Sequence, residues 1–172
     1  PVLTYGSTPQ VDLATWRLRL FGLVEQEVEL HWNDFLNLPW TVVNADFHCV
    51  TQWTALNNTW EGVLFSDVMK LVKIDPNACY VMAHCYGGYT TNMSLDILPL
   101  DGAILAHKHN CDKLSRDHGW PLRLLVPRKY GWKSAKWRNG LEFIAEDQPG
   151  FWERQGYHMR GDPWKEERFS SC

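Results

Sequence analysis

One cysteine of this chain stands where it could take part in chemistry. Cys49 lies in the stretch Asp46-Phe47-His48-Cys49-Val50-Thr51-Gln52-Trp53, after the strand-like run Trp40-Thr41-Val42-Val43. A thiolate is a soft, polarizable ligand that suits a soft or high-valent metal, and it is reactive when its pKa is lowered. A cysteine at the end of a strand can equally be a small apolar residue that closes the strand. The residue type alone leaves both interpretations open.

A second candidate is Arg123, which lies inside the apolar run 122–126. A charged side chain in a buried strand needs a partner, because burial of an isolated charge is costly. That partner could be a buried carboxylate or a bound anion. Phosphate is such an anion, and it favours fixed cations and backbone N–H groups. Two other cations nearby, Arg128 and Lys133, are expected to lie at the solvated surface.

A third group is formed by His107, His109 and Cys111, which recur at every second residue. In a strand they would face the same way, and both residue types are zinc ligands. The sequence shows no obvious fourth ligand, since the stretch runs on towards a turn. A zinc-stabilised structural protein therefore stands as an alternative.

The elements that must position these residues are short. Period-2 patterns and apolar runs of strand length predict strands, and capping residues and proline mark helix ends. The expected strands cover 16–20, 28–30, 40–43, 60–64, 80–83, 103–106, 122–126 and 141–145. The expected helices cover 32–38, 67–72 with Ser66 as the N-cap, and 95–98 with Ser94 as the N-cap, and a polar loop is expected over 57–59.

These elements predict an α+β fold in which the 172 residues form a single domain. Residues 1–15 are expected to be an extended N-terminal arm, and residues 150–172 a C-terminal tail wrapped over the body. The net charge of -3 argues against general binding of nucleic acid. No apolar run approaches the ~20 residues of a membrane-spanning helix.

The five cysteines form no C-x-x-C pair, which disfavours a disulfide framework and a structural zinc site of that kind. Scattered cysteines favour a reducing compartment, so the cytoplasm is expected. The periplasm stays open if a signal peptide was removed. Ten tryptophans are unusual at this length, and they could wall a cofactor crevice or pack the core.

Two motifs resemble those of the sulfite oxidase-like molybdopterin oxidoreductases. The first is His48-Cys49-Val50-Thr51-Gln52-Trp53, similar to that family's Cys-Val-Thr-x-Trp signature. The second is His118-Gly119-Trp120-Pro121-Leu122-Arg123-Leu124-Leu125-Val126-Pro127, followed by Lys129-Tyr130-Gly131-Trp132-Lys133-Ser134-Ala135-Lys136-Trp137. The two occur in the family's order and at a plausible separation. The resemblance implies a compact, largely β, mixed-sheet molybdopterin-binding domain.

The resemblance also implies roles for individual residues. Cys49 matches the only protein ligand to molybdenum, and the cofactor is a single pyranopterin. The residues that match those contacting the pterin and its phosphate are His118, Arg123, Ser134, Ala135 and Lys136. Cys85 ends a stretch that lines up with a family strand whose last residue, a threonine in reductase-type members, lies beside the cofactor. A contact with the cofactor and a plain buried thiol are equally open for Cys85.

The N-terminal arm bears on the substrate. Leu3-Thr4-Tyr5-Gly6-Ser7 occupies the place where true sulfite oxidases carry an Arg-Asn-His segment, whose arginine helps to bind sulfite. Tyr5 matches that arginine, so a fixed cation is replaced by a neutral phenol. This departure favours reduction of a neutral S-oxide or N-oxide over oxidation of sulfite.

The sequence is thus interpreted as a molybdenum-cofactor-dependent oxidoreductase that catalyses oxygen-atom transfer. Its expected partners are a small oxo-transfer substrate and a separate electron-transfer protein that is haem- or quinone-linked, because the chain has no Cys-x-x-Cys-His. The alternatives are a sulfite oxidase proper and a non-catalytic module that keeps the fold without the cofactor.

Overall fold

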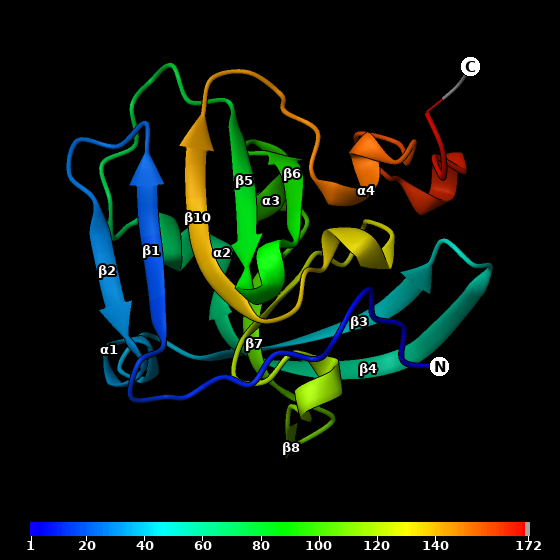
Figure 1. Ribbon diagram of the computed structural model, residues 1–172, viewed down its shortest axis with the longest axis horizontal. Coiled ribbons are helices and arrows are strands. Elements are labelled where there is room, and N and C mark those ends of the chain that lie inside the picture. Colours follow the sequence, from blue (N-terminus) through cyan, green and yellow to red (C-terminus); the bar gives the residue numbers. More distant parts are fainter. Residues whose placement is uncertain (171–172) are drawn as a thin grey trace.

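The computed structural model describes residues 1–170, and two five-stranded sheets form its framework (Figure 1). The first sheet has the strand order β2-β1-β10-β5-β6. Its strands are β1 (Arg17–Gly22), β2 (Val28–His31), β5 (Tyr80–Cys85), β6 (Thr90–Ser94) and β10 (Arg138–Ile144). β1 and β10 are parallel, with Arg19 opposite Gly140, and the other neighbours are antiparallel.

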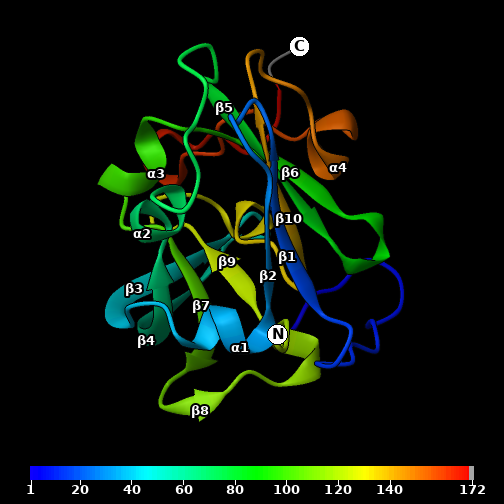
Figure 2. The ribbon, with the colours of Figure 1, turned by 90° about the vertical axis from the view of Figure 1, so that its left-hand side faces the viewer.

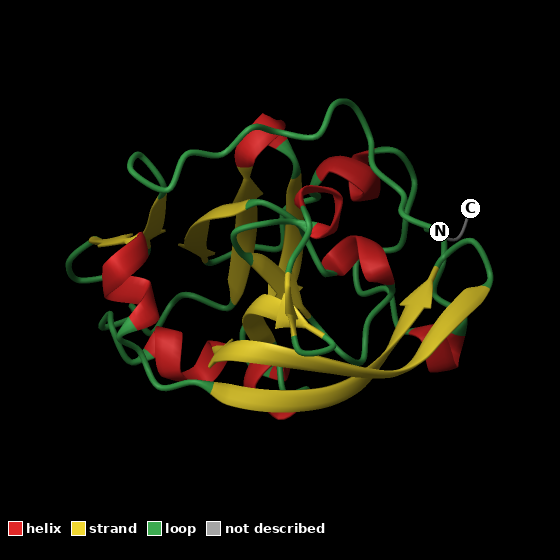
Figure 3. Ribbon diagram, turned by 90° about the horizontal axis from the view of Figure 1, so that it is seen from below, coloured by secondary structure: helices red, strands yellow, loops and turns green. Residues whose placement is uncertain are grey.

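The second sheet is built on a long, curved hairpin that runs beneath the first sheet (Figures 1 and 3). Its strand order is β3-β4-β7-β8, and β9 pairs with β7 as well. The strands are β3 (Thr41–Cys49), β4 (Trp53–Leu64), β7 (Ile104–His109), β8 (Asp112–Lys113) and β9 (Arg123–Leu125).

Four α-helices of no more than five residues complete the described part: α1 (Trp32–Leu36), α2 (Phe65–Met69), α3 (Ile97–Leu100) and α4 (Phe151–Arg154). Short 3₁₀ turns are η1 (Tyr86–Gly88), η2 (Arg116–His118), η3 (Gly131–Lys133) and η4 (Pro163–Lys165). α2 and α3 pack together on one side of the molecule, at the left of Figure 2. None of the described helices is long and apolar enough to cross a membrane.

The central strands β7 and β9 are buried on both faces, which explains their continuous apolar runs. Leu105 and Leu124 belong to the main core between the sheets, together with Leu18 and Phe143. Their chain neighbours point the other way, into a smaller cluster around Trp60. The α+β prediction is confirmed, and this double burial fixes the register of the strand that carries Arg123.

The prediction of a polar loop over 57–59 is wrong, because β4 continues through these residues. The hairpin register shifts between Ala45 and Phe47, which marks a β-bulge. Asn57 has a φ of 58°, and its N–H donates to Asp46 Oδ1 at 2.8 Å. Polar residues that would end a strand elsewhere are accommodated here by a bulge, and the hairpin stays continuous.

Two predicted helix caps are also wrong. α2 begins at Phe65, so Ser66 lies inside the helix, which ends at Met69. Ser94 ends strand β6, which the sequence analysis did not predict, and α3 begins at Ile97. Short polar runs such as Thr90–Ser94 lack an apolar pattern, and they become strand here because β5 supplies a full antiparallel partner.

The histidine–cysteine stretch does not form a metal site. A register shift at Glu61/Gly62 interrupts the alternation of β7, so the two histidines face different neighbours. The His107 ring lies 3.8 Å from the Trp40 ring, whereas the His109 ring stacks on Trp60 at 4.2 Å. Burial lowers the pKa of His107 to about 4. Within residues 1–170, no group of three or more His, Cys, Asp or Glu side chains could hold a metal ion.

Both chain ends lie over the body as irregular segments. Residues 1–16 form no helix or strand, and the tail up to residue 170 holds only α4, η4 and an isolated bridge between Tyr157 and Phe169. The last two residues of the predicted tail lie outside the described range. In Figure 1 the first residues approach the hairpin, which places the arm beside Cys49.

Candidate active site

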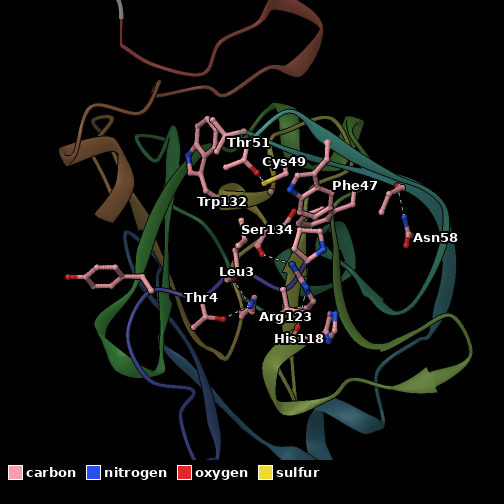
Figure 4. A pocket seen from close by; sticks show the side chains of 18 of the residues that line it. Leu3, Thr4, Phe47, Cys49, Thr51, Asn58, His118, Arg123, Trp132 and Ser134 are labelled. Carbon is pink, nitrogen blue, oxygen red and sulfur yellow. Dashed lines mark hydrogen bonds between the residues drawn. The ribbon is translucent and has the colours of Figure 1, made fainter.

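A cavity of about 520 Å³ opens at the end of the hairpin. Six parts of the chain line it: the arm (1–5), the hairpin β3–β4, His109 of β7, the pair His118 and Arg123, the loop 131–136, and the tail at Trp152 and Tyr157. Figure 4 shows Cys49 at one end of the cavity and Arg123 with His118 at the other. Residues from separate parts of the sequence therefore meet in one place.

Cys49 is the last residue of β3, as the sequence predicted. The turn that follows is closed by a hydrogen bond from the Gln52 N–H to the Cys49 carbonyl at 3.1 Å, with Gln52 at a φ of 69°. The Cys49 side chain is half-buried, and its Sγ lies 3.1 Å from Thr51 Oγ1. The thiol therefore faces the cavity from a rigid strand end and is free to bind a ligand.

Aromatic rings form much of the cavity wall. Phe47 stacks on Trp53 with ring centroids 6.2 Å apart, and Trp132 meets Tyr157 edge-on at 4.8 Å. Trp152 stacks on Tyr157 at 5.0 Å. Several tryptophans thus line a crevice, which was one of the two roles expected for them. Tyr157 was missed, because nothing in the tail shows a period or a motif that would mark it.

Arg123 is buried, with only 3% of its surface exposed. Its guanidinium donates to the carbonyls of His118 at 3.1 Å and Ser134 at 2.9 Å, and its Nε has no hydrogen-bond partner. No carboxylate pairs with it among the ion pairs of residues 1–170. Burial lowers its pKa to about 10, so the cation persists at neutral pH. The guanidinium also lies over the rings of Phe47 and Trp60, at 5.4 and 5.2 Å. A buried cation that no carboxylate neutralises within residues 1–170 fits an anionic group bound in the cavity.

His118 and Lys136 flank Arg123 because the chain turns sharply at Gly119. Gly119 has a φ of 108°, and a Cβ there would lie 3.0 Å from the Lys136 Cβ and 3.1 Å from the Arg123 Cβ. Burial, followed by the Arg123 charge, lowers the pKa of Lys136 to about 8. Its Nζ donates to the carbonyls of Leu3 at 2.9 Å and Asp117 at 2.7 Å. Arg123 and Lys136 therefore form a positive end of the cavity, and burial, followed by the Arg123 charge, lowers the pKa of His118 beside them.

The loop 134–136 contributes in two ways. Ser134 lines the cavity, but its Oγ accepts the N–H of Val126 at 3.0 Å and its carbonyl accepts from Arg123. Ala135 lines an adjoining hollow of about 340 Å³ beneath the arm instead, and its carbonyl accepts the Leu124 N–H at 2.9 Å. The two residues fix the loop against the strand that carries Arg123.

Tyr5 and Cys85 are the two other residues that the sequence predicted for the site. Tyr5 is at the cavity rim, 69% exposed, with its ring 4.7 Å from Phe151. Cys85 is buried and is not among the residues that line the described cavity. Its Sγ lies 3.9 Å from Arg138 Nη1, and burial raises its pKa to about 11. The structure therefore places Cys85 behind the cavity as a neutral thiol, and its contact with a cofactor stays a prediction.

A buried ion pair holds the tail against the cavity wall. Lys133, which the sequence placed on the surface, is buried, and its Nζ lies 2.6 Å from Glu153 Oε1. The same oxygen accepts from Thr91 Oγ1 at 2.8 Å and Trp132 Nε1 at 3.0 Å. Burial lowers the pKa of Lys133 despite the adjacent carboxylate. This network fixes the Trp132 ring.

Removing one member of this pair is expected to destabilise the protein strongly. Glu153→Gln should cost about 3–5 kcal/mol in the free energy of unfolding, because it leaves the Lys133 charge buried without a counter-ion. Urea unfolding measures the change. The control is Glu25→Gln, whose partner Lys73 lies 2.8 Å away at the surface, and its cost should stay within about 1 kcal/mol. Equal costs for the two variants would contradict a structural role for the buried pair.

Comparison with known proteins finds a matching family model, relatives in sequence and a similar solved structure. A family model described as the oxidoreductase molybdopterin binding domain matches residues 5–152. The oxidoreductase YuiH of Bacillus subtilis is 43% identical over 171 residues, which cover 99% of this chain and 86% of YuiH. The sulfane dehydrogenase SoxCD from Paracoccus pantotrophus has a similar fold, with a TM-score of 0.76 at 21% identity over 87% of this chain and 42% of that chain.

Other relatives are longer than this chain. YedZ1 of Azospira oryzae, whose name proposes a protein-methionine-sulfoxide reductase subunit, is 31% identical over 88% of this chain and 58% of its own length. The sulfite oxidase of Arabidopsis thaliana is 29% identical over 90% of this chain and 49% of its own length. The chain spans about half the length of these two relatives.

Proposed function

The chain belongs to the oxidoreductase molybdopterin-binding domain family, and from that premise we propose that it transfers an oxygen atom at a molybdenum bound by Cys49. The favoured reaction is reduction of a neutral S-oxide or N-oxide. The observation that carries this proposal is the pairing, in one cavity, of a half-buried thiol with a buried guanidinium that no carboxylate neutralises within residues 1–170.

The residues present fit a mono-pyranopterin molybdenum cofactor. When bound, this group supplies a metal centre that changes by two electrons as an oxygen atom is transferred. Cys49 would be its soft protein ligand, and Arg123, Lys136 and His118 would hold the pterin and its phosphate. The unpartnered Arg123 Nε and the aromatic walls are the features that favour an anionic, flat-ringed guest. Further backbone contacts would come from Ser134 and Ala135.

The preference for a neutral substrate follows from where the cavity's cationic side chains point. Arg123 lies at the end away from Cys49 (Figure 4) and donates to the carbonyls of His118 and Ser134. Lys136 donates to the carbonyls of Leu3 and Asp117. Figure 4 shows Trp132 close to Cys49, and Tyr157 packs against both Trp132 and Trp152. Aromatic faces favour an apolar sulfur substituent over a small dianion. The methionine-sulfoxide reductase role proposed in the name of YedZ1 supports the same direction.

Tyr157 is the candidate proton donor for this reaction. Reduction of a sulfoxide to a thioether consumes two electrons and two protons and releases one water. Burial, and then the nearby Cys49, raise the pKa of Tyr157, so its phenol stays protonated at neutral pH. A neutral phenol in the cavity wall can donate a hydrogen bond to a substrate oxygen without adding charge.

Oxidation of sulfite is the second candidate, and Arg168 is the observation that favours it. Cys49 also lines an outer hollow of about 450 Å³, together with His48, Glu166 and Arg168. The Arg168 guanidinium donates to the Val50 carbonyl and lies 2.8 Å from Glu166 Oε2. An anion that displaced Glu166 would find a cation near the thiol. The similarity to a sulfite oxidase supports this route.

Electrons would pass to or from a separate protein that is haem- or quinone-linked. YedZ1 is named as a subunit, which supports such an arrangement. A non-catalytic module is less favoured, because its crevice would be filled by side chains whereas this one holds about 520 Å³ of space.

The proposal is tested by molybdenum and zinc analysis, pterin fluorescence and a substrate screen on protein from a host that loads a related enzyme. We expect near-stoichiometric molybdenum with pterin, and a kcat/KM for reduction of a methyl sulfoxide at least about tenfold above that for oxidation of sulfite, a difference of about 1.4 kcal/mol. A preference for sulfite would establish the second candidate. Absence of molybdenum from such a host would support the non-catalytic module.

A further inference from the structure

Thr51 is the polar side chain that contacts the Cys49 sulfur. Its Oγ1 lies 3.1 Å from Sγ, and both residues line the cavity (Figure 4). In a thiol either atom could donate the hydrogen. A thiolate bound to a metal carries no hydrogen, so the Thr51 hydroxyl must then be the donor.

The turn that carries Thr51 is anchored at both sides. The Gln52 N–H donates to the Cys49 carbonyl at 3.1 Å, and Gln52 adopts the left-handed conformation that such a turn needs. On the outer side, the Arg168 guanidinium donates to the Val50 carbonyl. These two contacts hold the hydroxyl in reach of the sulfur even though the Thr51 side chain is exposed.

We infer that Thr51 is a positioning residue that donates a hydrogen bond to the metal-bound Cys49 sulfur and thereby raises the reduction potential of the molybdenum. The inference rests on the proposed role of Cys49 as the metal ligand. A donor at a thiolate withdraws electron density that the sulfur would otherwise give to the metal. The reduced metal leaves more negative charge on the sulfur, so the hydrogen bond is stronger in the reduced state. It therefore favours reduction.

The test compares Thr51→Val, which keeps the side-chain shape without the hydroxyl, with Thr51→Ser, which keeps the hydroxyl. The measurement is a potentiometric titration of the loaded protein followed by the electron paramagnetic resonance signal of Mo(V). Thr51→Val should shift the potential to a lower value, equivalent to a roughly three- to tenfold smaller equilibrium constant for reduction, the range of one hydrogen bond. Thr51→Ser should restore the value of the unchanged protein.

The matched control is Thr54→Val in the same hairpin, where the hydroxyl bonds His48 Nδ1 at 3.0 Å instead of the sulfur. The reduction potential of molybdenum in Thr54→Val should equal that of the unchanged protein. A potential that is the same in Thr51→Val and the unchanged protein, or equally lowered in the Val and Ser variants, would overturn the inference. Loss of molybdenum from Thr51→Val alone would support a hydrogen bond from the Thr51 hydroxyl to the Cys49 sulfur. Equal loss from Thr51→Val and Thr51→Ser would overturn the inference.

A separate measurement distinguishes failure of this inference from failure of the proposed ligand. X-ray absorption counts the sulfur atoms bound to molybdenum. Both Thr51 variants should keep the full count, and Cys49→Ser should lose one. If Cys49→Ser loses none, Cys49 is not the ligand and the proposed function fails. If the count behaves as expected but the potentials do not move, only the role of Thr51 fails.

Discussion

Cys49→Ser is expected to abolish oxygen-atom transfer, with kcat lower by about a thousandfold or more, which corresponds to about 4 kcal/mol of transition-state stabilisation. Serine is a harder and far less acidic ligand than cysteine, so it does not replace the soft thiolate at a metal that must change by two electrons. The fold should survive, because Cys49 ends a strand at a half-buried position outside the two core clusters. A steady-state assay with the best substrate of the screen measures the loss.

Cys79→Ser is the matched control, since Cys79 is exposed and does not line the cavity. It should leave kcat within about twofold. Circular dichroism and the midpoint of urea unfolding should be unchanged for both variants. Full activity of Cys49→Ser with molybdenum still bound would remove Cys49 from the mechanism.

Arg123→Met is expected to separate cofactor binding from stability. Retention of the molybdopterin should fall at least about a hundredfold, because loss of a buried partner of a charged group costs about 3–5 kcal/mol. The cofactor-free protein should lose little or no stability, since a buried cation without a carboxylate contributes less than a well-packed apolar side chain of similar volume. Pterin release during dialysis and urea unfolding of the cofactor-free protein measure the two effects.

Arg138→Met is the control for burial alone. Arg138 is also fully buried, and among residues 1–170 it pairs with no carboxylate, but it does not line the cavity. Its guanidinium donates to the His84 carbonyl at 3.2 Å. This variant should retain the cofactor. If both arginine variants lost it equally, the effect would come from disruption of the core and not from a lost contact at the cavity.

The features that the sequence predicted correctly depend on the local pattern of residues along the chain. Cys49 was placed at the end of a strand because an apolar, β-branched run precedes it and polar residues follow. Arg123 was identified because a charge inside an apolar run is costly wherever the strand is buried. Both statements need only the neighbours along the chain, and the structure agrees with both.

What the sequence did not show depends on contacts between distant residues. Lys133 was expected at the surface because its counter-ion, Glu153, lies 20 positions away on a tail without a period. Tyr157 was missed for the same reason, since only the folded tail brings it to the cavity. The loop expected over 57–59 failed because a bulge absorbs polar residues without breaking the strand.

The parallel pairing of β1 with β10 has a consequence for how the chain reaches its folded state. β10 is the only strand of this described sheet that joins the β1–β2 hairpin to the β5–β6 hairpin, so the sheet cannot close before residue 144 is available. Both hairpins are synthesised before β10, which is their shared neighbour in the sheet. Such long-range closure slows folding and leaves apolar faces exposed meanwhile. Lys136 lies two residues before β10, and the Arg138 N–H donates to the Leu122 carbonyl at 2.9 Å, so we expect the Arg123 end of the cavity to be completed only when β10 has docked.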